Sequence, residues 1–207
     1  MKRILAALCG VLQVLSLAGC GSGGSSGPQL FESKIFSVPA LDESIGLDLF
    51  TNTLFFPSTP QKLLAGFDPF TGVSGVEYRA FLNFPLGGVP VNAIIDSAFL
   101  DIFINSIDPS QFSRTIPINI DLVPLSSFSQ QPFATKPITL IIPPNNQVGQ
   151  VSIDVTLLMV EAQRRGLADF QIRIQEVLSA TAPGPIEIND PLVVNAFTSP
   201  LLVVTYF

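Results

Sequence analysis

The sequence of 207 residues contains no histidine and no tryptophan, and only two of its residues are cysteines. Without histidine, neither a Ser-His-Asp nor a Cys-His catalytic system can form. The ordinary ligand sets of zinc, copper and haem sites are excluded for the same reason. The one glycine-rich run, residues 21–27, precedes no strand–helix unit, so the chain has no phosphate-binding loop. We therefore expect a protein without catalytic activity.

Positive charge is also scarce. Ten lysines and arginines stand against 16 aspartates and glutamates, and the formal net charge is −6. A chain with so few cations cannot neutralise many phosphates, so nucleic acid is not an expected partner. For the same reason the folded part should not adhere to anionic lipid by charge alone.

The first 20 residues have the pattern of a secretory signal. Lys2 and Arg3 give a positive start, residues 4–17 are almost wholly apolar, and the small pair Ala18-Gly19 precedes Cys20. A positive start followed by a short apolar stretch and small residues is typical of a cleaved signal peptide. The apolar stretch is too short for an ordinary membrane-spanning helix. The pattern therefore predicts export from the cytoplasm.

Small residues directly before a cysteine make this segment similar to a bacterial lipoprotein signal peptide. In that family the cysteine thiol takes a diacylglycerol, the peptide is cut before the cysteine, and the new N-terminus is acylated, as with palmitate. The resemblance implies lipidation at Cys20, and the membrane as a partner through it; an ordinary signal peptide with an incidental cysteine is the alternative. Gly21 in place of aspartate implies onward export to the outer membrane in a Gram-negative cell. Cys9 would leave with the signal, so no disulfide is expected.

Composition divides the chain into three parts. Residues 1–19 are the expected signal peptide, and residues 20–30 form a lipidated tether whose Gly/Ser content is typical of a flexible linker. Residues 31–207 are long enough to bury a substantial core and are expected to form a single domain. The chain thus predicts one domain held near a membrane.

Short apolar runs in the domain predict strands rather than long helices. Eighteen prolines and 15 glycines are spread along the chain and indicate many turns. Four runs show the alternation of a half-buried strand. Their apolar positions are Ala98, Leu100, Ile102 and Ile104; Ile116, Ile118, Ile120 and Leu122; Val151, Ile153 and Val155; and Phe170, Ile172 and Ile174. Asn119, Asp121, Gln171 and Arg173 are expected to face outward. The pattern predicts an all-β sandwich or barrel.

One segment departs from this pattern and predicts a short helix at about residues 155–165. Asp154 or Thr156 can cap its first turn. Arg164 and Arg165 suit the negative end of the helix dipole, and Gly166 is a suitable left-handed stop. The arginine pair is therefore interpreted as a solvated helix end rather than a binding patch.

Over about residues 38–207 the chain resembles the DNRLRE-type domain, which is grouped with carbohydrate-binding modules. Residues 78–86, read YRAFLNFPL, match an arginine leading into an apolar strand that ends in Phe-x-Leu. Residues 93–102 match a later stretch, and residues 154–166 match an Asp-Val-Thr strand end that runs into a short helix. Residues 200–206 match the C-terminal strand. Family members usually carry a tryptophan in the helix, where this chain has Ala162-Gln163.

The resemblance implies a jelly-roll-like antiparallel β-sandwich on a secreted or surface protein. We expect a non-catalytic module for binding or assembly at the cell envelope, whose partner is an envelope protein or a polysaccharide. The alternative is a carbohydrate-binding module that recognises a surface or extracellular polysaccharide. A divergent hydrolase, a third alternative, would need two carboxylates about 5 to 10 Å apart in an open cleft.

Calcium is the cofactor that the composition still permits, because it needs only oxygen ligands. Asp42-Glu43 with Asp48, or Asn189-Asp190, are two alternative contributors, but solvated turn carboxylates are the favoured interpretation. Residues 50–75 are the least assignable part of the domain. The aromatics in residues 55–57 and 66–70 are interpreted as lids over the core, with an exposed partner patch as the alternative.

Overall fold

A computed structural model describes residues 28–59, 61–107, 115–124, 130–143, 148–177, 184–191, 195 and 197–207. The expected signal peptide, Cys20 and most of the tether lie outside the described residues. The described chain is all-β with one short α-helix, as the alternation and the glycine and proline content predict.

The elements follow one another along the chain as a series of strands, interrupted by one 3-10 turn and one α-helix. They are β1 (Phe31–Phe36), β2 (Glu43–Asp48), β3 (Thr53–Phe55), β4 (Lys62–Asp68), β5 (Val76–Pro85), η1 (Leu86–Gly88), β6 (Ile95–Ile107), β7 (Thr115–Leu122), β8 (Ala134–Ile141), β9 (Gly149–Asp154), α2 (Thr156–Arg164), β10 (Asp169–Glu176), β11 (Ile186–Asn189) and β12 (Leu201–Tyr206).

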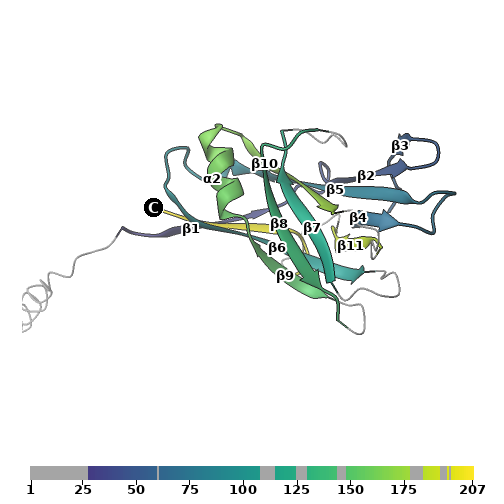
Figure 1. Ribbon diagram of the computed structural model, residues 1–207. Coiled ribbons are helices and arrows are strands. Elements are labelled where there is room, and N and C mark those ends of the chain that lie inside the picture. The colour runs from purple at the N-terminus through teal and green to yellow at the C-terminus, as the bar shows by residue number, and fades with distance from the viewer. Residues whose placement is uncertain are drawn as a thin grey trace, which may run out of the picture.

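All twelve strands belong to one connected antiparallel sheet. Its main path runs β1-β12-β6-β11-β4-β5-β10-β7-β8, while β2, β3 and β9 pair off this path. The sheet curls on itself, so that its two halves enclose the core (Figure 1). The pairing of β4 with both β11 and β5 joins these halves.

The molecule has two distinct ends (Figure 1). At the end that we call the tether end, β1 begins at Phe31 opposite Tyr206 of β12, so the entry and the exit of the chain lie together. The opposite end, which we call the distal end, carries the β2–β3 turn and the β4–β5 turn, because Asp48 of β2 and Asp68 of β4 both pair with Val76 of β5.

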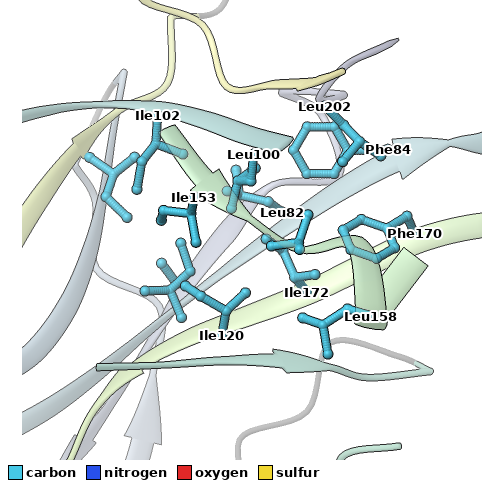
Figure 2. Close-up of a cluster of buried hydrophobic side chains, with 14 of the residues drawn as sticks. Leu82, Phe84, Leu100, Ile102, Ile120, Ile153, Leu158, Phe170, Ile172 and Leu202 are labelled. Atoms are coloured by element: carbon cyan, nitrogen blue, oxygen red, sulfur yellow. The ribbon is translucent and has the colours of Figure 1, made fainter. Parts of the chain in front are cut away.

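The core contains the apolar positions that alternation identified. Ile116, Ile118, Ile120 and Leu122 are fully buried in β7, and so are Phe170, Ile172 and Ile174 in β10. Ala98, Leu100, Ile102 and Ile104 are buried in β6, and Ile153 is buried in β9. Figure 2 shows members of this cluster, contributed by both halves of the sheet. A period-two pattern therefore located the core correctly.

Substitution of a core isoleucine should test this assignment. Ile118→Ala or Ile102→Ala should each lower the free energy of unfolding by about 2–5 kcal/mol, because the methyl groups leave a cavity in a close-packed interior. Ile141 is an exposed isoleucine of the neighbouring strand β8, and Ile141→Ala should change stability by no more than about 0.5 kcal/mol. Urea unfolding measures all three, and equal midpoints for Ile118→Ala and Ile141→Ala would contradict the assignment.

The helix α2 lies where the sequence predicted it. Asp154 Oδ1 accepts a hydrogen bond from the backbone N–H of Thr156 at 2.9 Å and so satisfies the first helical amide. Gly166 has a φ of 65°, the left-handed conformation expected of a helix stop. Arg164 and Arg165 both pair with Glu161, at 2.7 and 2.6 Å, so the arginines have partners within the helix itself.

One prediction about side-chain placement is wrong in part, and one outward side chain is more buried than expected. Arg173 faces outward from the core, as predicted, yet only 4% of its side chain is exposed, because it pairs with Asp121 and donates to the Gln130 carbonyl. The aromatics of residues 55–57 and 66–70 were interpreted as core lids, but Phe56 and Phe70 are 70% and 79% exposed, whereas Phe55 and Phe67 are half-buried. Alternation identifies the face of a strand, but it does not show what covers that face.

Candidate functional site

An apolar cavity opens at the tether end between η1, the segment that follows it, and α2. Its volume is about 470 Å³. The lining is mostly apolar and comprises Leu86, Gly87, Val89, Pro90, Val91, Met159, Gln163, Gly166, Leu167 and Ala168. A cavity of this size and character suits an apolar group rather than a charged one.

One polar side chain holds the wall of this cavity in place. Gln163 of α2 donates from Nε2 to the carbonyl of Ala93 at 2.7 Å, and Nε2 also lies 3.3 Å from the carbonyl of Pro90. A second fixed point is Ile94, whose N–H and carbonyl both bond to the backbone of Phe207. The segment from residue 90 to 94 is thus fastened to the helix and to the end of β12.

A pair of carboxyl groups lies beside β4, where sequence reasoning had proposed two separate sets. Asp42 directly precedes β2, and Asp190 directly follows β11. Strand β4 brings them together, because Leu64 of β4 donates its N–H to the Ser44 hydroxyl at 2.7 Å, and Asp190 donates its N–H to the Gln61 carbonyl at 3.0 Å. The structure therefore joins one acid from each set.

The two carboxyl groups are desolvated and in mutual contact. Asp42 Oδ1 accepts the N–H of Asn83 at 2.7 Å, whereas Asp42 Oδ2 and Asp190 Oδ1 are buried without a hydrogen-bond partner in the described part of the chain. Burial raises the pKa of Asp42 to about 8 and that of Asp190 to about 6. Two acids in this situation can share a proton or, alternatively, hold a cation.

The pair supplies few ligands for a metal. Among the described residues there is no group of three or more acidic, histidine or cysteine side chains that could hold an ion. Asp48, which one calcium set included, instead accepts the N–H groups of Phe50 and Thr51 within its own turn, at 2.8 and 2.9 Å. A calcium ion at Asp42 and Asp190 would therefore need most of its six to eight oxygens from elsewhere.

A further buried acid is Glu176, the last residue of β10, which lies beside the end of β4. Glu176 Oε2 accepts the N–H of Phe67 at 3.0 Å, while its Oε1 has no partner in the described part of the molecule. Burial raises the pKa of Glu176 to about 7. Burial thus raises the pKa of three described acids, Asp42, Asp190 and Glu176, and the chain contains no histidine to relay a proton to them.

A charged network on the outer face of the sheet was missed by sequence reasoning. Arg173 of β10 lies opposite Asp121 of β7 and donates from Nη2 to Asp121 Oδ2 at 2.6 Å. Gln175 and Thr135 donate to the same carboxylate at 2.8 and 2.6 Å, and Arg173 Nη1 donates to the Gln130 carbonyl at 2.8 Å. The carboxylate and the guanidinium are therefore held by several bonds each, as a structural element.

The turns at the distal end present apolar side chains to solvent. Each turn starts at an aspartate whose Oδ1 accepts the N–H of the residue two positions later, Asp48 for Phe50 and Asp68 for Phe70, both at 2.8 Å. The turns are adjacent, since Leu49 donates its N–H to the Gly75 carbonyl at 3.2 Å. Their exposed apolar side chains are Leu49, Phe50, Phe70 and Val73, which we call the distal patch.

The two tyrosines do not extend this patch. Tyr78 is buried in β5 with its ring edge toward Phe55, and Tyr206 is partly buried and stacks on Phe31 at the tether end. Both lie in strands. The Tyr78 hydroxyl is a hydrogen-bond partner of the Thr71 side chain in the β4–β5 turn, while its ring is buried and not part of the patch.

Comparison with protein families and with curated proteins identifies no relative. No family model matches the chain, and a search of curated proteins finds no match either. Within the described residues, no helix has both the length and the apolar character required to cross a bilayer. The function is therefore argued from the residues and their arrangement alone.

Proposed function

We propose that this protein is a lipid-anchored, extracytoplasmic, non-catalytic module that binds another macromolecule or supports an assembly at the cell envelope. The proposed anchor is Cys20, and the outer membrane is the expected location in a Gram-negative cell. The observation that carries the proposal is that the chain enters at one end of the molecule and the distal patch lies at the other. The segment that leads back to Cys20 joins one end, while the distal patch lies at the other end (Figure 1).

The distal patch is the proposed contact surface for that macromolecule. Phe50 and Phe70 are 63% and 79% exposed, on turns that their own aspartates fix. Apolar side chains on rigid turns can be buried by a partner with little loss of conformational entropy. A module anchored at one end and apolar at the other would hold such a partner away from the bilayer.

The finer fold proposal is a jelly-roll-like sandwich of the DNRLRE type. It is supported by the connected antiparallel sheet with its single short helix, and by the order of the resembling segments along the chain. The second candidate function, a carbohydrate-binding module, is favoured only by the exposed rings of Phe50 and Phe70. Retention on an immobilised polysaccharide that survives added salt would favour this second candidate.

Intact mass of the protein purified from membranes tests the anchor. We expect a mass that corresponds to cleavage before Cys20 with acyl chains added, because small residues precede this cysteine. The Cys20→Ala protein should leave the membrane fraction, because it lacks the thiol that would take the acyl chains. An unacylated mass for the wild-type protein, or a Cys20→Ala protein that stays with the membrane, would overturn the proposed anchor.

A further inference from the structure

The tether end carries a second exposed apolar surface, which we call the proximal patch. Val91 and Ile94 are 90% and 60% exposed, and they lie in the segment that Gln163 fastens to α2. Its other members lie at the start of β1 and after the end of β12. The complete proximal patch comprises Leu30, Phe31, Val91, Ile94 and Phe207.

Three of these residues lie at neighbouring strand ends of the sheet. Ile94 and Phe207 exchange two backbone hydrogen bonds, at 2.9 and 3.1 Å, and therefore lie side by side. Phe31 lies opposite Tyr206 in the β1–β12 ladder, and its ring stacks on the tyrosine ring with centroids 6.0 Å apart. Because successive residues of a strand turn to opposite faces, Phe31 lies on the other face of this sheet end from Phe207 and Ile94. The proximal patch is thus the rim of the sheet at the tether end, and hydrogen-bonded backbone holds these three residues.

The chain before the described residues limits what can lie against this surface. Residues 21–27 separate the proposed lipidated cysteine from the first described residue, Pro28. The eight Cα–Cα steps from Cys20 to Pro28 span at most roughly 28 Å even when fully extended. If Cys20 is acylated, the proximal patch is therefore held close to the bilayer, at an effective concentration on the order of millimolar.

Residues 28–36 and 90–96, which carry most of the patch, contain only three charged side chains. Glu32 and Lys34 pair with each other at 3.2 Å and so contribute no net charge. Asp96, two residues after Ile94, is exposed and adds one negative charge. A surface of this kind should enter the apolar boundary of a bilayer by burial of hydrophobic area, with little dependence on salt.

We propose that the proximal patch docks on the surface of the bilayer that holds the lipid anchor. Val91 and Ile94 enter the boundary between headgroups and acyl chains, and the domain stands with its distal patch away from the membrane. This inference rests on the proposed anchor at Cys20 and adds an orientation that the anchor alone does not impose.

The absence of tryptophan from the chain makes a direct test possible. A single tryptophan is placed at the proximal patch in the Ile94→Trp protein, or at the distal patch in the matched Phe70→Trp protein; both sites are exposed, so both proteins should fold. The full lipidated proteins are reconstituted on vesicles of phosphatidylethanolamine and phosphatidylglycerol that contain brominated acyl chains. Val91→Trp provides a second proximal probe, and thermal unfolding checks each fold.

We expect the emission of the Ile94→Trp protein to fall by about half on brominated vesicles, because the side chain lies about 5–10 Å into the boundary. The Phe70→Trp protein should lose almost none, and added salt should not change either result. Equal emission on brominated and ordinary vesicles for both proximal probes, or quenching confined to Phe70→Trp, would overturn the docking. Flotation with the vesicles reports the anchor separately, so a protein that floats without quenching refutes docking alone, whereas one that does not float refutes the anchor.

Discussion

The Asp121→Ala protein is expected to lose about 3–5 kcal/mol of its free energy of unfolding. Asp121 and Arg173 have side chains that are only 1% and 4% exposed, and they lie directly opposite each other on β7 and β10. Removal of the carboxylate leaves the guanidinium buried without its counter-charge, which costs far more than the loss of one surface contact. Such a loss is a large fraction of the 5–15 kcal/mol that typically separates folded from unfolded chains.

Substitution of the partner, Arg173, should lower the free energy of unfolding by less than Asp121→Ala does. In the Arg173→Met protein, Asp121 keeps the hydroxyl of Thr135 and the amide of Gln175 as donors, at 2.6 and 2.8 Å. The double variant Asp121→Leu with Arg173→Met should recover much of the stability, because an apolar pair of similar volume needs no desolvated charges. Urea unfolding of the single and double variants gives the coupling energy of the pair.

An exposed ion pair of the same chain is the matched control. Glu161 pairs with Arg164, whose side chain is 65% exposed, and Glu161→Ala should cost no more than about 1 kcal/mol. The explanation by burial would be wrong if Asp121→Ala and Glu161→Ala shifted the urea midpoint equally. It would also be wrong if the double variant were no more stable than Asp121→Ala.

The parts of the fold that could be predicted from the sequence are those set by local periodicity. The alternation around Ile118 and Ile172 located core positions correctly, since a strand that is buried on one face repeats every two residues. The helix was also predictable, because Asp154, which bonds the first helical amide, and the stop at Gly166 lie within the same short segment. These elements carry their own signals along the chain.

The remaining parts depend on which segments meet in space. Asp42 and Asp190 belong to segments that are far apart along the chain, and strand order alone brings them together beside β4. Arg173 is buried because Asp121 on the neighbouring strand and the carbonyl of Gln130 both lie against it. The exposed turns at Phe50 and Phe70 follow from short strands β2, β3 and β4, which lack a clear alternation. Cys20 lies outside the described residues, so its lipidation remains a prediction.

The carboxyl pair predicts that the protein is more stable at pH 5 than at pH 8. Folding raises the pKa of Asp42 from 3.8 to about 8, so between about pH 4 and pH 8 the folded protein holds a proton that the unfolded chain has released. Stability therefore falls as pH rises through this window. Each pKa unit corresponds to about 1.4 kcal/mol, so even half of this shift amounts to about 3 kcal/mol.

Replacement of one acid by its amide should remove much of this pH dependence. In the Asp42→Asn protein, the amide oxygen can still accept the N–H of Asn83, while the amide N–H₂ can donate to Asp190 Oδ1, which otherwise has no partner in the described part of the chain. The variant should be more stable than wild type at pH 8, by about 1–2 kcal/mol, and nearly equal to it at pH 5. Asp96→Asn, an exposed site with the same change in charge, should leave the pH dependence as it is.

The alternative to a shared proton is that Asp42 and Asp190 together bind a calcium ion. Urea unfolding at pH 5 and pH 8, with calcium chloride or with a chelator, separates proton sharing from metal binding. If the two acids share a proton, calcium should leave the midpoint unchanged and Asp42→Asn should raise it at pH 8. If they hold the metal, calcium should raise the wild-type midpoint at pH 8, because an ion bound only by the folded state adds to its stability. Asp42→Asn should then abolish that gain, since it removes one of the two carboxylates available to the ion.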